Sequence, residues 1–245
     1  CAGSPKSGKS WRALQLALDV ANGNRFMGAR DVLRPGRVLY VALEESAART
    51  SKRMKKLQPK ESIYLQNITM VYELLPLRGG GAEQLEELVK RYTPNVVIVD
   101  TFLAVVGDGG ADKKNVLRSE YAEMNTLHKI AERHDTAMLL IHHKRKAVPG
   151  SSGLDSVSGT AGLTAAADAI WTIDKEDTGI SSISITGRDI EDQTLALKFE
   201  QGDPRRACHL KLEKLDFAVC PNCIWFGPRP PAITKMLTGG EAMAV

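Results

Sequence analysis

Short apolar runs alternate with amphipathic stretches along most of the chain. Four apolar runs have the unbroken, often β-branched composition of strands buried on both faces. These runs are Val38–Leu43, Val96–Val99, Ala137–Ile141 and Ala169–Ile173. Four other stretches, one before the first run and three between the runs, repeat apolar residues at helical spacing: 11–22, 46–57, 82–92 and 116–134. This alternation predicts a parallel sheet with right-handed crossovers and helices on its faces.

The pattern changes after residue 180, where polar and apolar positions alternate. Three such stretches are joined by short turns: Ser181–Thr186, Thr194–Phe199 and Leu210–Leu215. We interpret them as antiparallel strands at one edge of the sheet. The predicted fold class is therefore α/β, with a mostly parallel central sheet flanked by helices and an antiparallel C-terminal extension. We expect residues 1–215 to form one domain and residues 216–245 to form a poorly ordered tail.

The composition is that of a globular protein rather than a membrane or disordered one. A chain of 245 residues with 43% apolar and 25% charged residues suits one sizeable globular domain. The formal net charge of +4 permits nucleic-acid binding but does not indicate it, since dedicated binders carry a denser basic face. We find neither an apolar run of membrane-spanning length nor a signal peptide, so we expect no membrane partner. The four cysteines are too few for a disulfide framework, so we expect a reducing, cytoplasmic location.

Three of the four cysteines lie near the C-terminus. The spacing of Cys220 and Cys223 suits a metal knuckle, but Cys208 and His209 lack the partner spacing that is usual for zinc. Four cysteines also do not make a disulfide framework in a chain of this size. We therefore favour free thiols, with a zinc site as the alternative.

A glycine-rich motif opens the chain. Residues 3–10 read G-x-x-x-x-G-K-S, a phosphate-binding loop in which backbone N–H groups surround phosphate oxygens at the start of a helix. Lys9 adds a positive charge for the β- and γ-phosphates, and the Ser10 hydroxyl suits Mg²⁺. The pattern predicts a site for ATP and Mg²⁺ made by Gly3, Ser4, Pro5, Lys6, Ser7, Gly8, Lys9, Ser10 and Trp11.

The start of the chain departs from the usual context of this motif. A phosphate loop normally follows a buried strand, yet only Cys1 and Ala2 precede Gly3. The chain also begins with Cys rather than Met. We therefore expect the first strand, which is usually central in such a sheet, to be truncated together with anything upstream.

Acidic residues follow two of the predicted strands. Asp100 ends the run Val96–Val99, where a carboxylate can reach Mg²⁺ beside the phosphate loop, unless it merely caps the next loop. Many ATPases place a water-activating glutamate directly after this aspartate, but Thr101 stands here. Glu44 and Glu45 are the remaining candidates for the base, and Glu44 is favoured because it follows its strand directly. Alternatively, both acids stabilise the predicted helix 46–57, because negative charge near the start of a helix interacts favourably with its dipole.

Two histidines and a basic segment follow the strand that begins at Ala137. His142 and His143 face the crevice at the strand ends and are candidates to sense the γ-phosphate. A metal site there is disfavoured because adjacent strand residues point to opposite faces. The next residues, Lys144, Arg145 and Lys146, open a long loop of small residues. We expect this loop either to contact DNA or RNA or to be a solvated surface loop.

Arg188 is the remaining candidate for the chemistry. It follows an edge strand, Ser181–Thr186, far in sequence from the phosphate loop. From there it can reach the nucleotide of a neighbouring subunit and stabilise the transition state in trans. The alternative is a local ion pair with Asp189 or Asp192 in its own turn.

Six stretches together resemble the RecA-like ATPases of the hexameric replicative-helicase type, the RepA-like group of plasmids, phages and mobile elements. They are AGSPKSGKS, VLYVALEES, VVIVDT, LLIHHKRK, VSGTAGLTAAADAIW and ITGRDIEDQTLALKF. The resemblance implies ATP and Mg²⁺ on Lys9 and Ser10, with Asp100 on the metal. It also implies Glu44 as catalytic base, one histidine of the pair 142–143 as γ-phosphate sensor, and Arg188 as a finger across a ring interface.

The resulting expectation is an ATP-hydrolysing motor. We expect a homo-oligomeric ring, by resemblance a hexamer, that tracks single-stranded DNA as a helicase in plasmid or phage replication. Two alternatives stay open. One is a regulatory or recombination ATPase that does not unwind DNA, and the other is an ATP-dependent DNA-binding regulator with little hydrolysis.

Overall fold

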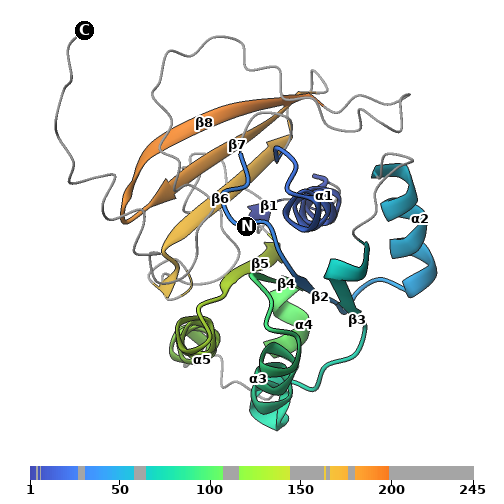
Figure 1. Cartoon of the computed structure of the whole chain (residues 1–245). Coiled ribbons are helices and arrows are strands. Elements are labelled where there is room, and N and C mark those ends of the chain that lie inside the picture. The colour runs from blue at the N-terminus through green and yellow to red at the C-terminus, as the bar shows by residue number, and fades with distance from the viewer. Residues whose placement is uncertain are drawn as a thin grey trace, which may run out of the picture.

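The computed structural model describes residues 1–3, 5, 7–26, 31–57, 65–106, 116–143, 163, 166–175 and 180–198. These residues build one sheet with helices on both faces (Figure 1). The strands, in spatial order β3-β2-β4-β5-β1-β6-β7-β8, continue from one edge to the other. Their bounds are β1 (Ala2–Gly3), β2 (Val38–Ala42), β3 (Ile68–Val71), β4 (Val96–Asp100), β5 (Ala137–His143), β6 (Ala169–Lys175), β7 (Ile180–Gly187) and β8 (Ile190–Lys198).

The strands from β3 to β6 in this order run parallel, and β7 and β8 add to β6 in antiparallel fashion. The register places Ala42 beside Asp100, Asp100 beside Ile141, and Gly3 beside His143. The carboxyl ends of β2, β4, β5 and β1 therefore meet at one edge of the sheet, which is where ligands bind in open α/β sheets.

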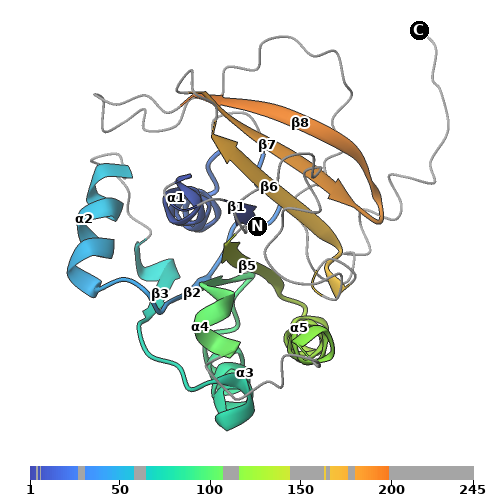
Figure 2. The ribbon, with the colours of Figure 1, turned by 180° about the vertical axis from the view of Figure 1, so that it is seen from behind.

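Helices cover the two faces separately, as the opposite views of Figures 1 and 2 show. One face carries α1 (Lys9–Asn22), with α2 (Ala47–Leu57) beside it, and the other carries α3 (Gly81–Tyr92), α4 (Phe102–Val106) and α5 (Val116–Arg133). Two short 3₁₀ turns, Leu65–Asn67 and Leu77–Gly79, lie in the connections. In the described part of the chain, no helix has the length and apolar character needed to cross a bilayer.

Two apolar clusters hold the layers together. In the first, Leu14 and Ala17 of α1 pack on Tyr40, Ile98 and Ile141. In the second, α3 and α5 pack on the alternate strand residues Leu39, Val41, Val97, Val99 and Met138. Because successive side chains of a strand point to opposite faces, the central strands are buried on both sides and read as continuous apolar runs.

The predicted fold class is confirmed, with differences in detail. Strand β5 continues through both histidines, and α4, which was not predicted from the sequence, directly follows Asp100 and Thr101. Helix α4 has only five residues, too few to show a helical period. The strand ahead of the phosphate loop comprises two residues, Ala2–Gly3, between β5 and β6. The predicted strand 210–215 and the tail 216–245 lie outside the described residues.

Candidate nucleotide-binding site

The phosphate loop connects β1 to α1 at the carboxyl edge of the sheet. Its close packing requires glycine at both ends: a Cβ on Gly3 would lie 2.7 Å from Ser7 Oγ and 3.0 Å from the Ile173 carbonyl oxygen. Gly8 has φ +85°, a left-handed conformation that suits glycine, and it caps the helix that begins at Lys9. The loop thus delivers the first free N–H groups of α1 to this edge. Ser4 and Lys6 lie outside the described residues.

Lys9 is buried although it carries an ammonium group. The residue is 6% exposed, and its Nζ donates to the Gly3 carbonyl oxygen at 2.8 Å. Burial lowers the pKa of the Lys9 ammonium, and repulsion from Arg12 lowers it further. Attraction to the carboxylates of Asp100 and Glu44 opposes this decrease. A desolvated ammonium beside a loop of backbone donors favours an anionic ligand.

Asp100 ends β4 on the same face of the sheet as α1. It is 5% exposed, accepts a hydrogen bond from Ser10, and accepts another from the Tyr40 hydroxyl at 2.9 Å. Burial raises the pKa of Asp100 above its ordinary value, despite these hydrogen bonds and the nearby Lys9. The hydroxyl of the loop and the strand-end carboxylate, predicted to share a metal, are therefore in contact.

The two glutamates after β2 contact different parts of the molecule. Glu45 pairs with Arg53 of α2, whereas Glu44 accepts a hydrogen bond from the Thr101 hydroxyl at 2.7 Å. Glu44 Oε2 also lies 3.7 Å from His143 Nε2. Of the two glutamates, Glu44 therefore faces Thr101 and His143 at the strand ends, whereas Glu45 is paired with α2.

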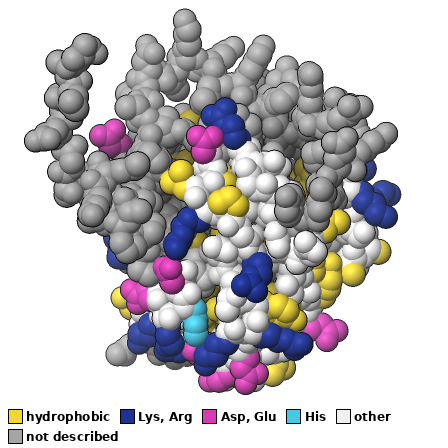
Figure 3. All heavy atoms as spheres, in the orientation of Figure 1, with side chains coloured by type: hydrophobic (Ala, Val, Ile, Leu, Met, Phe, Trp, Pro, Cys, Tyr) yellow, Lys and Arg dark blue, Asp and Glu magenta, His cyan; other side chains and the backbone are white. Residues whose placement is uncertain are grey.

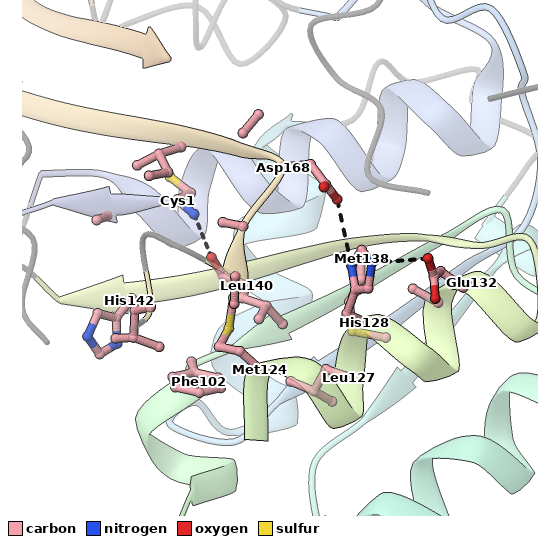
Figure 4. A pocket seen from close by; sticks show the side chains of 17 residues that line it. Cys1, Phe102, Met124, Leu127, His128, Glu132, Met138, Leu140, His142 and Asp168 are labelled. Atoms are coloured by element: carbon pink, nitrogen blue, oxygen red, sulfur yellow. Dashed lines mark hydrogen bonds and ion pairs between the residues drawn. The ribbon is translucent and has the colours of Figure 1, made fainter. Parts of the chain in front are cut away.

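The two histidines also point in different directions, because successive side chains of a strand lie on opposite faces of the sheet. His143 shares its face of the sheet with Ile141 and approaches Glu44. His142 points to the other face, where its ring meets that of Phe102 edge-on at a centroid distance of 5.8 Å. Figure 4 shows His142 and Phe102 in an apolar pocket with Met124 and Leu127. This pocket is not lined by Lys9, Ser10, Glu44 or Asp100, so it is separate from the phosphate loop.

Three contacts at the site were not predicted from the sequence. Arg12 of α1 donates from Nη1 to the Ser7 carbonyl oxygen at 2.5 Å and so braces the loop from inside. Arg53 lies over the ring of Trp11, 5.3 Å from its centroid. Tyr40 carries the hydroxyl that reaches Asp100. The contact of Tyr40 could have been predicted, because Tyr40 lies inside the apolar run Val38–Leu43 and a buried tyrosine hydroxyl usually has a hydrogen-bond partner.

Arg188 lies away from this edge. It follows β7, which pairs with β6 and β8 and is therefore not the edge strand predicted from the sequence. Its backbone N–H donates to the Asp168 carbonyl oxygen at 3.0 Å, and its Nη1 lies 3.6 Å from Asp168 Oδ1. Because β6 runs parallel to β1, its first residues lie at the end of the sheet opposite Gly3. Arg188 therefore does not join the site of its own chain, and its side chain is 59% exposed.

The donor set fits a hard cation. A magnesium ion takes oxygen ligands and keeps waters and phosphate oxygens in its shell, so it needs few protein ligands. Ser10 and Asp100, already in contact with each other, supply a hydroxyl and a carboxylate. Within the described ranges no cluster of three His, Cys, Asp or Glu side chains suits a metal, so a site of protein ligands alone is not seen there.

Two sets of predicted residues lie outside the described residues: Lys144–Lys146 of the basic loop, and Cys208, His209, Cys220 and Cys223 of the alternative zinc site. On the face shown in Figure 3, basic and acidic side chains of the described residues are interspersed. The described residues on that face therefore do not form the dense basic region that dedicated nucleic-acid binders carry.

The parallel sheet and the loop between β1 and α1 define an α/β domain with a phosphate-loop motif. The family model of the AAA domain matches residues 1–148, and the chain belongs to that family. No curated protein matches it.

Solved structures agree on the fold. One, an ATPase domain, has a TM-score of 0.64 at 15% identity, and the match covers 85% of this chain and 82% of that domain. The RadB recombinase has a TM-score of 0.60 at 16% identity, with coverages of 85% and 88%. A KaiC-like protein from the archaeon Pyrococcus horikoshii has a TM-score of 0.57 at 13% identity, with coverages of 85% and 86%.

The burial of Asp100 gives a testable consequence for stability. Replacing Asp100 by Asn keeps an acceptor for Tyr40 but removes a charge whose folded-state pKa is raised. We expect Asp100→Asn to increase the free energy of unfolding of the nucleotide-free protein at neutral pH. The gain should shrink as the pH falls through the raised pKa and vanish below the ordinary value of 3.8, where both side chains are uncharged.

Denaturant unfolding across this pH range measures the effect, with the exposed Asp192→Asn as the matched control. Equal stability of wild type and Asp100→Asn at neutral pH would show that burial does not penalise this carboxylate.

Proposed function

We propose that this chain hydrolyses ATP. The observation that carries the proposal is the convergence of Lys9, Ser10, Asp100, Glu44 and His143 at one edge of the sheet. Each comes from a different strand end or from the start of α1, so the fold itself brings the set together. A cation, a metal-ligand pair and a carboxylate that can act as base are groups that serve phosphoryl transfer to water, and His143 beside them can contact the γ-phosphate.

The roles follow from position. The N–H groups at the start of α1 and the Lys9 ammonium bind the β- and γ-phosphates, which they reach from the loop. Ser10 and Asp100 hold Mg²⁺, which shields phosphate charge when it is bound. Glu44 accepts the proton of the attacking water, while the water oxygen bonds to the γ-phosphorus. The bond from phosphorus to the bridging oxygen breaks, and its electron pair stays with ADP. His143, beside Glu44, is the γ-phosphate sensor of the pair.

Arg188 extends the proposal to an assembly. Its exposed side chain lies at the far end of the sheet from its own phosphate loop, so a role in catalysis requires a neighbouring subunit. We infer a homo-oligomeric ring, by resemblance a hexamer, in which Arg188 of one subunit completes the site of the next. Lys144, Arg145 and Lys146, which directly follow His143 in the sequence, supply positive charge for a nucleic-acid backbone and so support a motor on single-stranded DNA.

The phosphate-binding role of Lys9 is tested by substitution. We expect Lys9→Ala to lower ATP turnover by about a hundred- to a thousandfold, because a buried charge aimed at the phosphates is lost. Phosphate release measures turnover, and the exposed Lys129→Ala serves as the matched control. Turnover of Lys9→Ala at the wild-type rate would refute the phosphate-loop role.

The trans role of Arg188 is tested by mixing variants. Arg188→Ala should keep ATP binding and lose about a thousandfold in turnover, the scale of an arginine finger. Mixing it with Lys9→Ala should restore part of the turnover, since some sites then combine an intact loop from one variant with Arg188 from the other. Arg91→Ala, exposed on α3, is the control. Unchanged turnover of Arg188→Ala would remove this residue from the mechanism.

The helicase activity is tested on a forked DNA duplex. We expect ATP-dependent strand displacement by the wild type and none by Lys9→Ala. ATP turnover that single-stranded DNA stimulates without strand displacement would instead identify a non-unwinding ATPase. ATP-dependent retention on DNA with negligible phosphate release would identify a regulator.

A further inference from the structure

Thr101 contacts the candidate base from a fixed position. It follows Asp100 directly, is 2% exposed, and donates its hydroxyl proton to Glu44 Oε1 at 2.7 Å. The contact follows from the strand register. Ala42 pairs with Asp100, and the Leu43 N–H donates to the Asp100 carbonyl oxygen at 2.8 Å, so the chain beyond β2 still runs beside the chain beyond β4. Glu44 is thereby placed against Thr101.

Glu44 needs such a contact because its own side chain is 47% exposed. A glutamate in that position has several rotamers open to it, and fixing one of them costs conformational entropy. The buried Thr101 hydroxyl fixes Oε1, which leaves Oε2 as the oxygen that faces His143 at 3.7 Å. The two carboxylate oxygens therefore have different neighbours.

We propose that Thr101 is a positioning residue for ATP hydrolysis, which anchors Oε1 of Glu44 so that Oε2 receives the proton of the attacking water. The inference rests on the proposed function. It also accounts for the residue type after Asp100. Where the base stands on the neighbouring strand instead of directly after the aspartate, the position after the aspartate is free to carry a donor that orients it.

The hydroxyl also has no competing task in the described contacts of α4. The backbone carbonyl of Thr101, not its side chain, accepts from the Ala104 N–H at 3.2 Å. Replacing the hydroxyl by a methyl group therefore leaves that turn in place. Its expected effect is confined to the carboxylate of Glu44.

The test compares variants that lack the hydroxyl with one that keeps it. Thr101→Val, of nearly the same shape, and the smaller Thr101→Ala should each lower kcat for ATP by about ten- to a hundredfold, the scale of one hydrogen bond to a charged group. KM and nucleotide affinity should stay within about twofold, because neither variant touches the phosphates. Thr101→Ser should retain most of the wild-type kcat. A wild-type kcat in either hydroxyl-free variant, a change in KM alone, or failure of serine to rescue would overturn the proposal.

A double-mutant cycle assigns the effect to Glu44. If Thr101 acts through this carboxylate, adding Thr101→Val to Glu44→Gln should lower single-turnover hydrolysis no further. Full additivity of the two substitutions would overturn the proposal. Absence of Lys9-dependent turnover in the wild type would instead contradict the proposed function itself, so the two failures are distinguishable.

Discussion

The candidate site depends on two buried groups of opposite charge, Lys9 and Asp100. Burial lowers the pKa of the ammonium and raises the pKa of the carboxylate, so each charge is held in a place that disfavours it. Their mutual attraction and the hydrogen bonds from Ser10 and Tyr40 offset part of that cost. A triphosphate with a divalent cation would supply partners for both charges, which is the physical basis of the proposed site.

The sheet register brings these charges together. Gly3, His143, Asp100 and Ala42 lie at the ends of parallel strands that finish within a few residues of one another. Apolar clusters on both faces fix this alignment, because a shift of one residue would turn the inward side chains of a strand to the opposite face. The stability of the core and the geometry of the site are therefore two aspects of the same register.

The sequence predicts the parts of this site that depend on local pattern. The loop 3–10, its helix and the strand ending in Asp100 follow from short-range spacing, and so does the α/β fold. The preference for Glu44 over Glu45 also follows from its place directly after the strand, but the contact that separates the two, the ion pair of Glu45 with Arg53 of α2, does not follow from local spacing. The choice between His142 and His143 follows from strand alternation only once the face that carries α1 is known. The ion pair of Arg188 with Asp168 likewise arises from the pairing of β7 with β6.

A crystal structure with a non-hydrolysable ATP analogue and Mg²⁺ tests the central claim most directly. The γ-phosphate should lie between the Lys9 ammonium and the Glu44 carboxylate, with the metal bound to Ser10 and held near Asp100. A triphosphate bound elsewhere, such as in the pocket of His142 and Phe102, or one bound without contact to Lys9, would contradict it.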